Sequence, residues 1–300
     1  MEGIHWDKLF ERKFDMDEGN HRRITIWKTY HDESLIKEFN LEENERIFLF
    51  NSKNVGYDGK NINHLNQFLC EGVTLVYPYL NNLKSDIIGF QHYRRWFHSD
   101  EKSLNVKRIM NGEIQCFASW NDYYLTLKDR VKEHCNYWSV YECGMGDDIM
   151  EFLEKEYPEI YNHHTMKSEM IGFSISAMSW ESYLKYGKFI WDYICFINNK
   201  YDLRFEEERW ARHMEEKFIK FNQRHNIRRA FGHWDYKQGY GYGNWYTEPY
   251  ESKNSFKYGL YRMYSYHIEF LSSVWFNTHS HFIDKDNSIF YLVDGTKTHN

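Results

Sequence analysis

The segment 87–97 constrains this chain more than any other part of its sequence. A short apolar run, Ile87-Ile88-Gly89-Phe90, gives way to the polar run Gln91-His92-Tyr93-Arg94-Arg95. The apolar run is typical of a buried strand, and ligands of α/β proteins bind where such strands end. Two adjacent guanidinium groups at that point are costly unless an anion pairs with them. The sequence therefore predicts an anion site or, if surface carboxylates neutralise the arginines, an ordinary strand end.

Composition narrows the class of protein. The 300 residues suffice for one large domain with an ample core, and the net charge of −6 argues against a nucleic-acid-binding protein. The five cysteines form no C-x-x-C pair, which argues against a disulfide framework and against a cysteine-based zinc site. The sequence has no uninterrupted apolar run of about 18 residues that would span a membrane. We expect a cytoplasmic protein with at most peripheral contact with the inner face of a membrane.

The first half of the chain has the pattern of an α/β sheet. Residues 24–30 and 46–50 read as strands, and residues 87–95 read as a third. Between the second and third strands, apolar residues recur at steps of three and four and predict one amphipathic helix over residues 61–81. Strand, strand, helix and strand in this order predict a sheet with helices packed against it.

The second half of the chain is richer in helices. Its periodicity predicts a strand at 171–176 and helices at 147–157, 180–197, 205–221 and 260–274. No repeat, linker or break in composition indicates an independent second domain. We therefore expect an N-terminal extension at 1–22, one domain at 23–280 with a Gly/Tyr/Trp-rich insertion at 231–250, and a C-terminal tail at 281–300.

The order of several motifs resembles a known family. Asp58-Gly59-Lys60-Asn61-Ile62, then Glu71, then His92-Tyr93-Arg94-Arg95-Trp96-Phe97 follow one another. This order is similar to a bacterial family of unknown function with the signature D-x-x-G-x-N-I-S, E-L-T and H-Y-R-R-x-F. Its members accompany gene sets for capsule, O-antigen and exopolysaccharide synthesis and are regarded as glycosyltransferases. The likeness is specific in this central block and looser over residues 24–276 as a whole.

The resemblance implies both a fold and a reaction. The fold would be α/β of the glycosyltransferase A type: a single Rossmann-like, nucleotide-sugar-binding domain with a mixed central sheet and extra C-terminal helices. The reaction would move a sugar, by inversion, from a UDP-linked donor to a surface polysaccharide or a lipid-linked glycan. The transferred sugar would be galactofuranose or a related hexose. No nucleic acid would take part.

Metal dependence is a separate expectation. Enzymes of this fold usually place a metal-binding Asp-x-Asp at the end of a central strand, whereas this chain has His92-Tyr93-Arg94-Arg95 there. Two cations can replace a divalent ion in neutralising a departing diphosphate. We therefore expect no cofactor. The alternative is that His92, with His31 or Asp58, binds a divalent ion such as Mn or Mg.

The candidate site residues fall into three groups. Inverting transfer needs a carboxylate as general base, and Asp147, Asp148 and Glu269 are the candidates. The first two could instead cap a helix, and Glu269 could form a structural ion pair with Arg262. The acceptor would stack on Trp234, Tyr240, Tyr242 and Trp245, unless these rings only pack their own loop. Donor-binding candidates are Thr29, Tyr30, His31, Asn61, Asn66, Glu71, His92, Tyr93, Arg94 and Arg95.

A different class of function is also compatible with the sequence. A non-catalytic carbohydrate-binding or scaffold protein would use the aromatic loop at 231–250 as its main site. It would bind free glycan without responding to a nucleotide sugar. A nucleotide-sugar hydrolase is a third hypothesis, and it would consume the donor without an acceptor.

Overall fold

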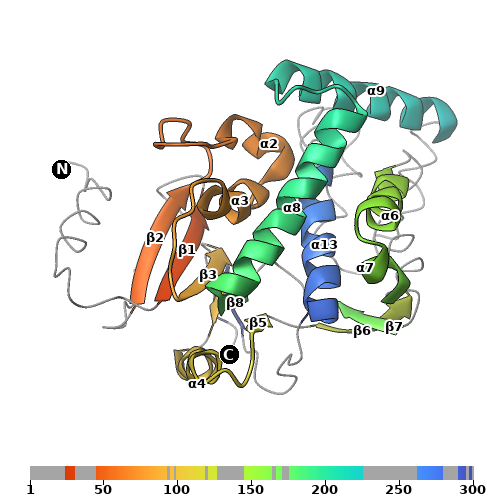
Figure 1. Ribbon diagram of the computed structural model, residues 1–300. Helices are drawn as coiled ribbons and strands as arrows, with labels where there is room; N and C mark the ends of the chain where they lie inside the picture. The colour runs from red at the N-terminus through yellow and green to blue at the C-terminus, as the bar shows by residue number, and fades with distance from the viewer. Residues whose placement is uncertain are drawn as a thin grey trace.

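A mixed sheet forms the centre of the molecule, and helices pack against it (Figure 1). The computed structural model describes residues 24–30, 45–92, 95–97, 99–118, 121–126, 145–163, 167–170, 176–225, 262–279, 290–294 and 297–298. Within them, eight strands join in one sheet, and β6 (Asn121–Thr126) and β7 (Lys167–Met170) form a separate pair. The expected α/β class with a mixed central sheet is confirmed.

The parallel part of the sheet is centred on β1 (Ile24–Tyr30). It pairs in parallel with β2 (Glu45–Asn51) on one side and with β3 (Ile87–His92) on the other. The chain therefore crosses over β1 between β2 and β3. As a result, the carboxyl ends of the three strands meet at one edge of the sheet. The first two strands were predicted from their sequence pattern and are confirmed.

The edge of β3 that faces away from β1 pairs with two different strands along its length. We call the point where one partner strand gives way to the other the fork. Residues Ile87 to Phe90 pair with the antiparallel strand β8 (Ser176–Ser179). On its other side, β8 pairs with β5 (Cys116–Ala118), also antiparallel. His92 instead pairs with Arg95, the first residue of β4 (Arg95–Phe97). The prediction of one strand reaching Arg95 is wrong, because the chain ends β3 at His92 and returns antiparallel.

The far C-terminal segment supports β4. The strand β9 (Phe290–Asp294) pairs with all three residues of β4, and β10 (Lys297–Thr298) pairs with β9. Residues 281–300, expected to be a tail, thus contribute two strands to the central sheet.

The helical crossover between β2 and β3 is broken. In place of the single helix predicted over residues 61–81, the chain forms the 3-10 turn η2 (Asn63–Leu65), α2 (Asn66–Leu69) and α3 (Gly72–Leu80). The break lies at Cys70, whose φ of 43° is incompatible with a continuous helix. A tertiary contact accompanies the break, since a Cβ on Gly72 would lie 2.5 Å from Cδ1 of Ile268.

Two long helices cover the same face of the sheet as α3. The predicted helix at 180–197 is α8 (Trp180–Lys200), and Oγ of Ser179 caps it by accepting a hydrogen bond from the Ser182 amide. The last predicted helix is α13 (Met263–His279), which runs beside α8 and shares a hydrogen bond of 2.7 Å between Tyr186 and Ser272. The remaining helices are α4 (Ser99–Met110), α6 (Met145–Glu156), α7 (Pro158–His163) and α9 (Glu207–His225).

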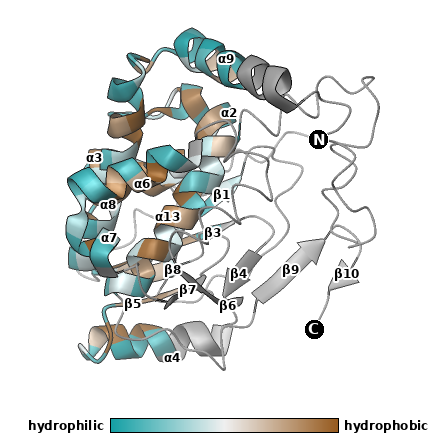
Figure 2. Cartoon of the chain, turned by 90° about the vertical axis from the view of Figure 1, so that its right-hand side faces the viewer, coloured by the Kyte–Doolittle hydropathy of each residue, from teal (hydrophilic) through white to brown (hydrophobic). Residues whose placement is uncertain are grey.

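The two faces of the sheet carry different side chains. Trp27 and Phe90 lie on the face under the helices, where Phe90 contacts Tyr183 at 5.4 Å between ring centroids. Ile26 lies on the opposite face, beside Gly89. Figure 2 shows that α9 is mostly hydrophilic, whereas α2 and α13 carry hydrophobic turns. Among the described residues, none of the helices has the length and apolar character that crossing a membrane requires.

Gly89 is required by the close approach of β1, β3 and β8. A Cβ there would lie 2.5 Å from Cδ1 of Ile26 and 3.3 Å from Cβ of Ala177. We expect Gly89→Ala to lower the free energy of unfolding in urea by about 1–3 kcal/mol through overpacking. Adding Ile26→Val removes the clashing methyl group, so the double variant should lose less than the sum of the single losses. Additive losses would contradict this packing account.

Candidate functional site

The aligned carboxyl ends of the parallel strands form the candidate site. In the register, Thr29 lies opposite His92, and Tyr30 lies opposite Asn51. Ser52 fixes the end of β1, because its amide and its Oγ both donate to the Tyr30 carbonyl at 2.9 and 3.1 Å. Thr29 and Tyr30 are buried. β1 has β2 on one side and β3 on the other, and the chain crosses over β1 between them. In an α/β sheet, the carboxyl edge beside such a crossover is the usual position of a ligand.

The histidine and arginine motif begins at this edge. His92 is the last residue of β3, and its backbone pairs with that of Arg95 at the fork. The motif is therefore divided between two antiparallel strands. Tyr93 and Arg94, and likewise His31 after β1, lie outside the described residues.

Two asparagine side chains hold the loop that follows β2, Asn61 from the loop itself and Asn81 from the end of α3. Asn61 donates from Nδ2 to the Tyr57 carbonyl at 3.1 Å and accepts from the Asn63 amide at 3.3 Å. Asn81 accepts from the Lys60 amide at 2.8 Å and donates to the Lys60 carbonyl at 2.7 Å. Asn61, predicted to bind donor, thus has its amide engaged in shaping the loop. Asn81, and Tyr57, whose hydroxyl accepts from the Asn51 amide at 2.9 Å, were missed as supports because their partners are backbone groups, which leave no sequence signal.

Two predicted site residues from distant segments come together at the α2–α3 break. Glu71 is the N-cap residue of α3, and Glu269 lies on α13; both are half-buried. Cys70 connects them, because both carboxylates raise the pKa of its thiol. Arg262, the expected structural partner of Glu269, lies in the same group. Asn66 opens α2 one turn earlier and is also half-buried.

Cys70 itself is unsuited to nucleophilic chemistry. Burial raises the pKa of its thiol to about 12, with Glu71 adding to the effect, while Arg262 and a hydrogen bond with Ser265 oppose it. A thiol with so high a pKa stays protonated near neutral pH. The chemistry available in this group therefore belongs to its carboxylates and its guanidinium.

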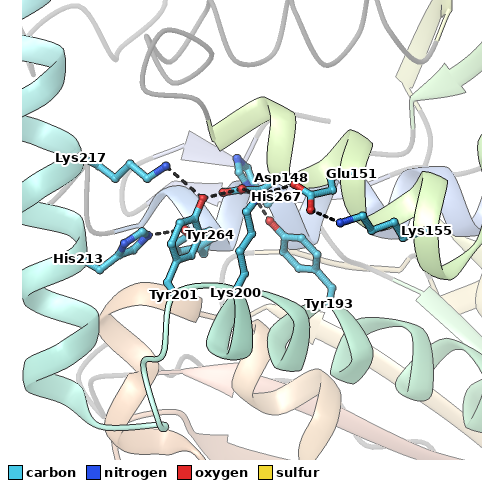
Figure 3. A network of polar contacts seen from close by, with 10 residues as sticks. All are labelled: Asp148, Glu151, Lys155, Tyr193, Lys200, Tyr201, His213, Lys217, Tyr264 and His267. Carbon is cyan, nitrogen blue, oxygen red and sulfur yellow. Dashed lines mark hydrogen bonds and ion pairs between the residues drawn. The ribbon is translucent and has the colours of Figure 1, made fainter.

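Asp148 lies in a buried polar network rather than at the sheet edge (Figure 3). It is fully buried in the first turn of α6, and its Oδ1 accepts from Nζ of Lys200 at 2.6 Å and from the hydroxyl of Tyr201 at 2.7 Å. Its Oδ2 has no hydrogen-bond partner among the described residues. Burial raises the pKa of Asp148, and the bonds from Lys200 and Tyr201 partly offset it. Asp147, its neighbour, is exposed.

The network extends to α9 and α13. Lys217 of α9 donates to the Tyr201 hydroxyl at 3.1 Å, and His213 bonds the hydroxyl of Tyr264 on α13 at 2.8 Å. Deeper in the same layer, Tyr193 of α8 bonds Nδ1 of His267. The sequence pattern gave no indication of these partners, which are far from Asp148 along the chain. The network ties α6, α8, α9 and α13 together.

The predicted acceptor site stays a prediction. The aromatic residues expected to bind acceptor, Trp234, Tyr240, Tyr242 and Trp245, lie outside the described residues. Across the described ranges, no group of three or more His, Cys, Asp or Glu side chains is arranged to hold a metal ion.

Breaking the Lys200–Asp148 ion pair should cost far more than breaking a surface pair. Lys200→Met leaves a buried carboxylate with one fewer donor, so we expect a loss of about 3 kcal/mol in the free energy of unfolding at neutral pH. Lys155→Met is the control, because it removes an exposed partner of Glu151 and should cost less than about 1 kcal/mol. Urea unfolding measures both. Equal losses would mean that burial does not set the strength of the pair.

The contribution of Asp148 should also depend on pH. Burial raises its folded-state pKa above the ordinary value of 3.8, so the folded chain holds this proton more tightly than the unfolded chain. The stability of wild type relative to Asp148→Asn should therefore be greatest in acid and should fall as the pH rises through the folded-state pKa. Urea unfolding of both proteins from acid to neutral pH tests this. A difference that grows with pH would reverse the assigned sign.

Comparison with known proteins identifies the family to which the chain belongs. No curated protein matches the chain. Among solved structures, it is similar to an apo structure of WbbM, a bifunctional glycosyltransferase, with 16% identity and a TM-score of 0.41. That likeness covers 67% of this chain and 43% of the other, so this chain spans less than half of the WbbM length. A family model described as a domain of unknown function, DUF4422, matches residues 41–226, and because this is more than half of the chain, the chain belongs to the DUF4422 family.

Proposed function

We propose that this protein is a glycosyltransferase that takes a sugar from a nucleoside diphosphate donor bound at the carboxyl edge of β1, β2 and β3. The observation that carries the proposal is the register, which aligns Thr29 with His92 where the strands end. The motif resemblance of the central block supports the same reaction. A sheet edge flanked by a crossover suits a nucleotide, and adjacent guanidiniums suit a diphosphate.

The proposed roles follow from position and charge. Arg94 and Arg95, with His92 and Tyr93, would neutralise the charge that develops on the departing diphosphate. Thr29, Tyr30 and His31 would line the nucleotide at the end of β1. Under this proposal the arginines do the work of a divalent ion, so transfer should persist in EDTA.

The sugar and the general base belong to the group around Cys70. Glu71 and Asn66 would accept hydrogen bonds from sugar hydroxyls, because a carboxylate can accept two in one plane. Glu269 is the best-supported base, since it is half-buried beside Glu71, and exposed Asp147 is the second candidate. Asp148 is less suited, because Lys200 and Tyr201 already donate to it.

The finer parts of the proposal come from the motif resemblance. The donor would be UDP-linked and carry galactofuranose or a related hexose, and transfer would invert the anomeric centre. The acceptor would be a surface polysaccharide or a lipid-linked glycan, held by the aromatic loop. The enzyme would work in the cytoplasm, with at most peripheral contact with the membrane.

The arginine pair provides the direct test. We expect Arg94→Ala and Arg95→Ala each to lower transfer from the preferred nucleotide sugar at least 100-fold, because each removes a donor to the leaving group. Arg212→Ala is the control, since Arg212 is exposed on α9. The measurement is sugar transfer across a panel of nucleotide sugars, with and without EDTA. Near-wild-type transfer by both variants would refute the diphosphate role, and glycan binding without any response to nucleotide sugars would favour a binding module.

A further inference from the structure

Ser176 is a buried hydroxyl without a hydrogen bond beside the candidate site. It is the first residue of β8 and has no exposed surface, and its Oγ finds no hydrogen-bond partner among the described residues. A buried hydroxyl in this state is costly, so the group calls for an explanation such as a bound ligand or an ordered water. Most buried hydroxyls described here do find partners. Ser272, for example, bonds both Tyr186 and the Ile268 carbonyl at 2.7 Å.

The register locates Ser176 relative to the site. It lies opposite Phe90, which in turn lies opposite Trp27, so the three residues form one row on the helix-covered face. The next row on this face, toward the carboxyl edge, contains Thr29, whose backbone pairs with that of His92. Nε1 of Trp27 is likewise buried without an acceptor in the described part of the chain. Two unsatisfied polar groups therefore lie directly beneath the row proposed to bind donor.

The fork lies between this row and the row of Thr29 and His92. On the β8 side, the described pairing of β3 stops at Phe90, and on the β4 side it begins at His92. Gln91 pairs with Lys28 of β1 and has no described partner on its other side. Ser176 is thus the first residue of β8 at the place where the two neighbours of β3 separate.

We infer that the Ser176 hydroxyl is a ligand-binding group that hydrogen-bonds the sugar carried by the donor. The inference rests on the proposed function and adds a specificity residue to it. A serine hydroxyl both donates and accepts, which matches a sugar hydroxyl, whereas a phosphate offers only acceptors. Ser176 is fully buried in the structure, so this hydrogen bond requires the side chains over it to move when the donor binds.

The test compares two buried serines in binding and in stability. Ser176→Ala should weaken binding of the preferred nucleotide sugar 5- to 30-fold in calorimetry and leave binding of the free nucleoside diphosphate unchanged. Because the substitution removes a group without partners, the midpoint of thermal unfolding without ligand should stay the same or rise. Ser272→Ala should lower that midpoint and leave both affinities unchanged.

Each other outcome counts against the inference in a different way. Unchanged sugar-nucleotide affinity in Ser176→Ala would overturn it while the proposed function stands. Equal weakening with the free diphosphate would overturn the assignment to the sugar. A lower unfolding midpoint for Ser176→Ala would mean that an ordered water satisfies the hydroxyl. If wild type binds no nucleotide sugar, the inference fails together with the proposed function.

Discussion

The parallel pairing of β1 with both β2 and β3 is the constraint on which the rest of the structure depends. It fixes the carboxyl ends of three strands at one edge, whatever the loops beyond them do. It also requires a crossover between β2 and β3, and the helices of that crossover pack over Trp27, whose ring lies 5.8 Å from that of Tyr77 on α3. The break at Cys70 then brings Glu71 toward α13. The carboxyl edge of the sheet and the pair of carboxylates at Glu71 and Glu269 therefore both follow from this strand order.

Two kinds of side-chain packing hold the helical layer together. Near the sheet it is apolar and aromatic, with Phe90, Tyr183 and Trp180 in contact. Farther from the sheet, between α6, α8, α9 and α13, it is polar and charged around Asp148 (Figure 3). A buried ion pair adds little net stability compared with apolar packing, but it tolerates few alternative arrangements. We therefore regard the Asp148 network as fixing how these helices meet.

The sequence was informative wherever a local period decides the structure. β1, β2 and α8 were predictable because their apolar residues alone determine what they bury. The break at Cys70 was not, because it is coupled to a contact of Gly72 with Ile268, far along the chain. The end of β3 at His92 was missed for a similar reason, since the pairing with β4 is supported by β9. In the site, the juxtaposition of Thr29 and His92 follows from strand order, whereas the partners of Asp148 required the tertiary structure.

The pairing of β4 with β9 has a consequence for when the site forms. β4 is held to β3 by a single described residue pair, at His92 and Arg95, but to β9 by three. The partner residues of β9 follow β3 by almost 200 residues and are therefore synthesised well after β1, β2 and β3. Contacts so distant in sequence form late, because closing the intervening chain costs entropy. On a ribosome, the sheet edge would be in place long before the strand that begins at Arg95 is secured, so a chain cut short before β9 would be folded over much of its length and yet lack a complete site.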